Sequence, residues 1–332
     1  MHSSFARDDN TSGPEDSGDT TRDARLDALR SAIERDRDPK SRVAHEATLS
    51  LLERSDRADA GDFTEGWDRF AEAAIGLVSE DNWAPTVGAL ANMVGLVHFA
   101  EPADFVTASR LAKRYGHRKI AALQATGDEL LGTGPSMPVA TRMVMILSLT
   151  DWIIESLTDS GMEKEEATEV ADRCYQAGFW LVLSEVDPTR PGPLLRTPED
   201  VISTWDHGGI RAWRGQVAII ASNPWAPYGN ELMELALAAG RPAPVHAIDE
   251  AVKVYRSRFE RRERELVARE IRQLVAMSGL SQREFAAMAG TSASRLSTYV
   301  NGLVTPSATM MVRIRRVSEL VQNRRAHGRY DS

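Results

Sequence analysis

Cysteine is the scarcest residue type in this chain of 332 residues, with one copy, Cys174. A single thiol cannot form an intramolecular disulfide or a cysteine-based zinc site, which excludes a secreted scaffold held by disulfides. Long hydrophobic runs are also missing, because the longest in the middle of the chain, Met143 to Thr150, is far shorter than the ~20 residues that cross a bilayer. The N-terminus lacks the basic and then apolar layout of a signal peptide. We therefore expect a cytoplasmic protein with no membrane partner.

Positive charge is scarce in most of the chain and concentrated at its end. The whole sequence has 40 basic and 48 acidic residues, a formal net charge of -8. Residues 258–332 hold 14 arginines and 7 acidic residues, whereas residues 1–257 hold 26 basic and 41 acidic residues. An acidic body with a basic end indicates that only the end meets a polyanion. A helical hairpin with a solvated arginine face would give the same charge, so charge alone leaves both interpretations open.

Patterns typical of β-strands are absent as well. There are no paired runs of alternating hydrophobicity joined by hairpin turns, and apolar residues recur three and four apart from Asp23 onward. The sequence therefore predicts an all-α protein. The stretch from Met143 to Leu157 is apolar on nearly all sides, which predicts the central helix of a bundle.

Composition divides the chain into several parts. The first residues are small, polar and acidic, which predicts disorder, and residues 187–198 hold four prolines and one glycine, which predicts a linker. Dense charge of both signs after residue 255 predicts an exposed helical connector. The expected parts are a disordered tail (1–22), a helical domain for oligomerisation or sensing (23–186), a linker (187–197), a small helical subdomain (198–245), a charged connector helix (246–265), a basic C-terminal domain (266–325) and a second tail (326–332).

The most informative segment contains two short predicted helices joined by a tight turn. Ser281 and Glu284 form a capping-box pattern that starts the first helix, Gln282–Met288. Gly290 follows it, and Ser292 has the position of an N-cap for a second helix that ends near Val300. Two short helices joined at a glycine form a helix-turn-helix.

The spacing of this segment has physical reasons. Ala286 is small where the second helix crosses the first, Gly290 tolerates left-handed dihedral angles in the turn, and Leu296 anchors the second helix. The expected core of this domain also contains Phe285, Met288, Tyr299 and, on a last helix that begins at Thr305-Pro306, Met310, Ile314, Val317 and Leu320. Such a unit presents its second helix to a DNA major groove, which is ~12 Å wide.

Residues 280–320 resemble the Cro/CI-type (XRE-family) helix-turn-helix domain. The resemblance rests on Leu280-Ser281-Gln282 at the first helix, Gly290-Thr291-Ser292 at the turn, Asn301-Gly302 after the second helix and Pro306-Ser307 at the next. The sequence also resembles actinobacterial regulators that carry this reader domain at the C-terminus. The resemblance implies a lambda-repressor-like DNA-binding domain at residues 266–325, and the apolar helical pattern before it predicts a bundle-like N-terminal domain.

The resemblance also implies residue roles. Gln282 resembles the glutamine that bonds a phosphate and braces the recognition helix, and the segment from Asn301 to Thr305 resembles a phosphate-contacting loop. The expected DNA-binding residues are Gln282, Arg283, Ser292, Ala293, Ser294, Arg295, Ser297, Thr298, Asn301, Thr305 and Arg313. The base-facing side chains are small, and Arg295 is the one strong candidate for reading guanine, although its position also suits a phosphate. DNA shape or a second half-site is then expected to supply the remaining specificity.

These observations favour a sequence-specific transcriptional regulator, expected to be a repressor and a homodimer associated with the nucleoid. Its partner is double-stranded DNA, with a protein partner or small-molecule effector expected at residues 23–186. The alternatives are an antitoxin-like or adaptor protein that binds a protein through its helical body, a nucleoid binder with little sequence preference, and a helix-turn-helix that serves only packing.

Nothing in the sequence predicts an enzyme, a cofactor or a metal site. His45-Glu46 begins like a zinc-protease motif, but the second histidine is absent. Cys174 is expected to be buried and inert. Three tryptophans are expected in the core of the segment after the linker, with a ligand cage as the alternative: Trp205, Trp213 and Trp225.

Overall fold

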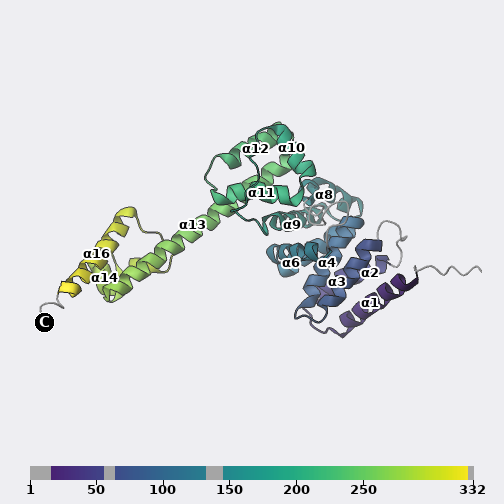
Figure 1. Cartoon of the computed structure of the whole chain (residues 1–332), viewed down its shortest axis with the longest axis horizontal. Helices are drawn as coiled ribbons and strands as arrows, with labels where there is room; N and C mark the ends of the chain where they lie inside the picture. Colours follow the sequence, from purple (N-terminus) through teal and green to yellow (C-terminus); the bar gives the residue numbers. More distant parts are fainter. Residues whose placement is uncertain (1–15, 56–63, 132–144, 328–332) are drawn as a thin grey trace, which may run out of the picture. The chain divides into compact units, whose positions relative to one another are not determined.

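A computed structural model describes residues 16–55, 64–131 and 145–327, and every element in these ranges is a helix (Figure 1). The all-α prediction is confirmed. The chain divides into two compact units, residues 1–251 and residues 252–332.

The first unit contains helices α1 (Asp16–Arg35), α2 (Arg42–Ser55), α3 (Thr64–Leu77), α4 (Trp83–His98), α5 (Pro102–Tyr115), α6 (His117–Leu131), the 3₁₀ turn η1 (Met145–Ser148), α8 (Thr150–Asp159), α9 (Lys164–Leu183), α10 (Pro198–His207), α11 (Gly209–Ser222) and α12 (Tyr228–Ala238). Helix α13 (Pro242–Ser278) begins in the first unit and ends in the second. The second unit is completed by α14 (Gln282–Ala289), α15 (Ala293–Val300) and α16 (Ala308–His327).

Helix α4 is the central helix of the first unit. It packs against α2, α3, α5 and α6, and its residues from Val87 to Leu96 are all buried. Small residues allow this close packing, because a Cβ at Gly88 would lie 2.7 Å from Ala44. The prediction of a central helix from Met143 to Leu157 is therefore wrong. Its described part is η1 followed by the short α8, on which Trp152 is 44% exposed.

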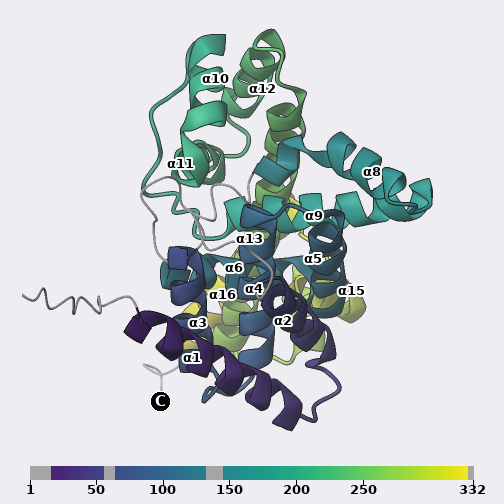
Figure 2. The same ribbon diagram turned by 90° about the vertical axis from the view of Figure 1, so that its right-hand side faces the viewer.

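Helix α9 joins the two halves of the first unit. It packs against α5, α6, α8 and α11, and Figure 2 shows α10, α11 and α12 grouped above it. Apolar side chains of α9 and α11, such as Phe179 and Trp213, are buried. The structure places residues 198–245, for which the sequence predicted a small helical subdomain, in the same compact unit as residues 23–186.

The proline-rich segment before α10 is held against α11. The amide of Gly192 donates to the Gly215 carbonyl at 3.0 Å, and the Gln216 side chain donates to the Pro193 carbonyl at 3.0 Å. The Leu195 amide donates to the Tyr228 hydroxyl at 3.2 Å. Residues 187–197 are non-helical, as expected of a linker, but these bonds make them a packed part of the unit.

Two further predictions differ from the structure. Helix α1 begins at Asp16, so the expected disorder of residues 1–22 is wrong for residues 16–22, and residues 1–15 lie outside the described residues. Further along α1, Leu26 and Leu29 are buried in the core, and the helix packs against α3. Trp213 is buried and Trp205 contacts it edge-on at 4.6 Å between ring centroids, but Trp225 is 47% exposed and does not belong to the core.

The second unit is a four-helix arrangement around a small core. Helix α13 is one continuous helix of 37 residues, and its residues 260–266 are all exposed, as the charge pattern indicated. Further along α13, Ile271 packs against residues of α14, α15 and α16. The buried residues of this core are Ile271, Phe285, Ala286, Ala289, Leu296, Tyr299, Ile314 and Val317.

Candidate nucleic-acid interface

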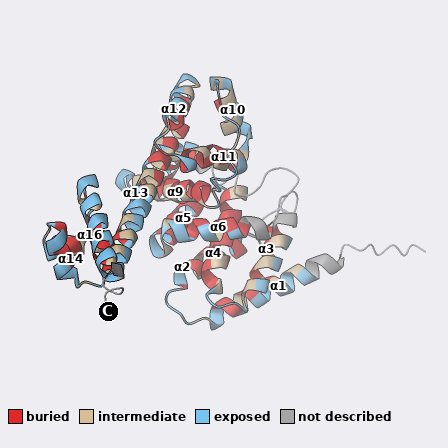
Figure 3. Ribbon diagram, turned by 60° about the vertical axis from the view of Figure 1, so that its left-hand side comes forward, coloured by how far each residue is buried: buried red, intermediate tan, exposed pale blue. Residues whose placement is uncertain are grey.

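The crossing of α14 and α15 is set by the residues that spacing singled out. Ala286 is 1% exposed and Leu296 is fully buried, so both lie inside the second unit. Gly290 ends α14 with φ 71° and ψ 38°, a left-handed conformation that favours glycine. Figure 3 shows buried residues inside the second unit and exposed residues on the outer faces of α13, α14 and α16.

Both short helices begin at serine caps, as the sequence predicts. The Ser281 hydroxyl accepts a hydrogen bond from the Glu284 amide at 3.3 Å, and the Glu284 carboxylate accepts one from the Ser281 amide at 2.9 Å. The Ser281 hydroxyl also donates to the Glu284 carboxylate at 2.6 Å, and this bond together with the one from the Ser281 amide holds the pKa of Glu284 below its usual value. The Ser292 hydroxyl accepts from the Arg295 amide at 3.1 Å. Caps of this kind fix where α15 begins and therefore which of its side chains point outward.

The expected DNA-binding residues fall into two groups by exposure. The exposed ones are Gln282, Arg283, Ser292, Ala293, Ser294, Arg295, Asn301, Thr305 and Arg313. Ser297 and Thr298 are half-buried. The structure brings Ala293, Ser294 and Arg295 together on the first turn of α15, with Gln282 and Arg283 on the first turn of α14.

Several hydroxyl and guanidinium groups on α15 already have partners within the helix. The Thr298 hydroxyl donates to the Arg295 carbonyl at 2.8 Å, and the Asn301 amide donates to the Ser297 hydroxyl at 3.3 Å. Arg295 Nε donates to the hydroxyl of the buried Tyr299 at 2.9 Å. This bond directs the Arg295 side chain along α15 toward Tyr299.

Exposed arginines of α14 and α16 give the second unit a basic surface. Within the described residues, Arg283, Arg313 and Arg316 form no ion pair. Arg313 lies near the turn, since its Nη1 is 3.8 Å from the position of a Cβ at Gly290. Unpaired exposed guanidinium groups suit contacts with phosphate oxygens.

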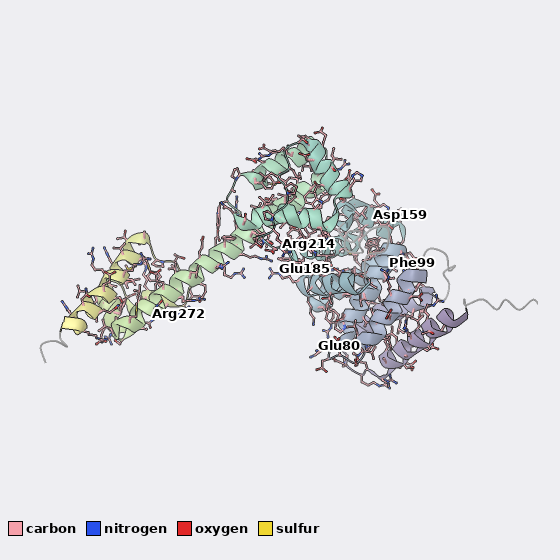
Figure 4. All side chains as sticks on the ribbon, in the orientation of Figure 1. Glu80, Phe99, Asp159, Glu185, Arg214 and Arg272 are labelled. Carbon is pink, nitrogen blue, oxygen red and sulfur yellow. The ribbon has the colours of Figure 1, made fainter. Side chains whose placement is uncertain are left out.

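One positioning residue was not found from the sequence. Arg272 on α13 donates from Nη1 to the Val300 carbonyl at 2.6 Å and pairs through Nη2 with Glu265 at 2.6 Å (Figure 4). The Val300 carbonyl is at the C-terminal end of α15, where helix carbonyls lack intrahelical partners. Arg272 therefore holds this end of α15 on α13. No local pattern links residues 272 and 300, so only the fold reveals this contact.

Two core predictions in this unit are wrong. Met288 is 45% exposed and Leu320 is 39% exposed. The buried positions are Ala289 on α14 and Val321 on α16 instead. Each lies one residue further along the chain, which keeps it on the same face as the buried Phe285 and Val317 of its helix.

A comparison with known protein families agrees with this geometry. Residues 269–317 match a family described as Helix-turn-helix. The C-terminal unit carries a helix-turn-helix domain. The domain is of the Cro/CI type, a DNA-binding family, and the match covers a small part of the 332-residue chain. No curated protein and no solved structure matches the chain.

The described residues offer neither a metal site nor a membrane-spanning helix. No group of three or more histidine, cysteine, aspartate or glutamate side chains is placed to hold a metal ion there. None of the helices in those ranges combines the length and the apolar character that a membrane span requires.

Proposed function

We propose that this protein is a sequence-specific transcriptional regulator that reads the DNA major groove with residues 292–300. The observation that carries the proposal is the exposure of Ala293, Ser294 and Arg295 on the first turn of α15, together with exposed arginines of α14 and α16 that form no ion pair within the described residues. In this arrangement the arginines bind phosphates whatever the sequence, and α15 discriminates between bases.

The proposed active form is a homodimer on a two-fold symmetric operator. Readers of this type bind half-sites about 10 base pairs apart, because that distance returns the second recognition helix to the same face of the duplex. Repression is the proposed outcome, since a dimer bound over a promoter excludes other proteins from it. The helical first unit is proposed to mediate self-association or to sense a protein partner or an effector.

A substitution on the outward face of α15 tests the proposal. The operator is first selected from random duplexes with the full chain. Ser294→Glu adds a negative charge on the first turn of α15, where the helix dipole favours it and the fold is retained. Repulsion from the DNA backbone is expected to weaken operator binding more than about tenfold.

The matched control is Ser257→Glu, which adds the same charge at an exposed serine on α13. Fluorescence anisotropy over a salt series measures both variants. Equal affinities for the two variants, or an affinity that does not depend on salt, would contradict the proposal. Deletion of residues 262–332 distinguishes the regulator proposal from the adaptor alternative. The deletion abolishes the function of a regulator, whereas the helical body alone retains the function of an adaptor.

A further inference from the structure

The first unit contains a hollow of ligand size. It has a volume of about 720 Å³ and lies between the segment after α9 and the N-terminal turns of α11. Small-molecule sites in proteins typically have volumes of roughly 300–1,000 Å³. The charged and hydroxyl side chains that line it are Glu185, Asp187, Arg190, Thr204, Arg211 and Arg214.

The charge of this hollow is opposite to that of its surroundings. Residues 1–251 hold 24 basic and 41 acidic residues, yet three arginines and only two acidic residues line the hollow. Guanidinium groups bind carboxylates and phosphates through paired, charge-assisted hydrogen bonds. An excess of arginine within an acidic unit therefore favours a small anion over a cation as the occupant.

Arg214 is held in place for such contacts. Its side chain is 16% exposed, and its Nη2 donates to the Leu181 carbonyl at 3.0 Å and to the Ser184 hydroxyl at 3.2 Å. Its Nη1 binds the Glu185 carboxylate at 2.6 Å, and Figure 4 shows the two side chains next to each other. The guanidinium is thus oriented before any ligand arrives, which lowers the entropic cost of binding.

Arg211 supplies a second positive charge on the same helix face. It precedes Arg214 by three residues on α11, a spacing that places the two side chains side by side. Arg211 is exposed and forms no ion pair with the residues that the structure describes. It lies in the first turn of α11, whose N-cap Gly208 offers no capping side chain, so the helix dipole adds to the positive potential there.

The Glu185 carboxylate has the features of a group that competes with a ligand for Arg214. Its φ is 59°, a left-handed conformation that non-glycine residues rarely adopt and that recurs at ligand sites. Its carboxylate is exposed to solvent on one side and bonded to Arg214 on the other. This carboxylate occupies the position on Arg214 that the acidic group of a ligand would take.

We propose that this hollow binds a small organic anion whose carboxylate or phosphate group bridges Arg211 and Arg214 and displaces the Glu185 carboxylate. The site lies entirely in the first unit, so the proposal does not depend on DNA binding.

Calorimetric titration of the full chain tests the site, with citrate and inorganic phosphate as probes at an ionic strength held constant with sodium chloride. The wild type is expected to bind at least one probe saturably. Arg211→Gln is expected to weaken that binding about tenfold, because a charge-assisted contact is lost. Glu185→Gln is expected to strengthen it about threefold or more, because the internal competitor no longer carries a charge.

Matched controls separate the site from the overall charge. Arg37→Gln and Glu155→Gln make the same charge changes at exposed residues of the first unit that do not line the hollow. Binding to the arginines of the second unit contributes equally in all variants. Tighter binding of citrate indicates a carboxylate ligand, and tighter binding of phosphate a phosphate ligand.

Absence of saturable binding of both probes would overturn the proposal. So would equal affinities for Arg211→Gln and Arg37→Gln, or for Glu185→Gln and Glu155→Gln. Operator binding, measured on the same variants, reports the DNA-binding proposal separately.

Discussion

The outward side chains of α15 are short and mostly carry hydroxyl groups, and Arg295 is the exception. Ala293 offers a thymine methyl group only an apolar contact, and serine and threonine hydroxyls accept or donate to several bases. The Arg295 guanidinium alone on this helix can pair with both acceptors of a guanine. Its bond to the Tyr299 hydroxyl sets the direction in which it reaches.

We expect Arg295→Ala to relax discrimination at one base pair of the operator, at a cost of about 1–3 kcal/mol. Binding to duplexes with each base at each position measures the effect. Tyr299→Phe keeps the guanidinium but removes its hydroxyl partner, so it is expected to give a smaller loss at the same base pair. A uniform weakening on every duplex would identify Arg295 as a phosphate contact instead.

Cys174 illustrates how burial controls chemistry at a single residue. It is 1% exposed on α9, and burial raises the pKa of its thiol to about 12. Because the thiolate is the reactive form, the folded protein is expected to react negligibly with a disulfide reagent at pH 8 and completely after unfolding. The absorbance of the thiolate that the reagent releases measures the reaction of the folded and the unfolded protein. Rapid stoichiometric reaction of the folded protein would contradict this expectation.

At the scale of helices, α15 is held at both ends by different means. Its start is fixed by the local Ser292 cap, and its end by Arg272 from α13. The Ser292 cap joins residues three positions apart, whereas the Arg272 contact joins residues 28 positions apart. The position of α15 therefore depends on α13 as well as on the helix-turn-helix itself.

Replacing Arg272 tests this dependence. Arg272→Gln is expected to lower the stability of the second unit by about 1 kcal/mol and to weaken binding to every duplex equally, because Arg272 orients α15 and reads no base. Thermal unfolding and anisotropy measure the two effects. Arg269→Gln removes a nearby exposed arginine of α13 and is the control. A loss confined to one base pair would show that residue 272 acts in base reading.

The sequence predicted the features of α14 and α15 that arise locally. Caps at Ser281 and Ser292, the glycine turn and the small Ala286 are set by neighbours within one or two helical turns, so they are visible in the sequence. The central position of α4 and the Arg272 contact depend on packing between distant segments, which a single sequence does not encode in any local pattern. The sequence wrongly predicts Met288 and Leu320 in the core, because the apolar character of a side chain does not determine which face of its helix is buried.

At the scale of the whole molecule, charge is divided between the two units. Residues 252–332 hold 16 basic and 7 acidic residues, whereas residues 1–251 are acidic. Part of the basic charge of the second unit is neutralised by ion pairs within it, such as Arg272–Glu265 and Arg315–Glu270. The remaining exposed arginines of the second unit, among them Arg283 and Arg313, are the candidates for phosphate contacts.

The salt dependence of binding counts these contacts. Each phosphate neutralised adds about 0.9 to the magnitude of the slope of log affinity against log salt, because counterions are released from the duplex. Arg283→Gln and Arg313→Gln are each expected to reduce the slope by about 0.9 and to weaken all duplexes alike. Arg37→Gln in the first unit makes the same charge change and is expected to leave the slope unchanged, since an acidic unit does not attract the duplex. A slope that falls equally for all three variants would mean that net charge, and not a built phosphate-binding surface around α15, draws the protein to DNA.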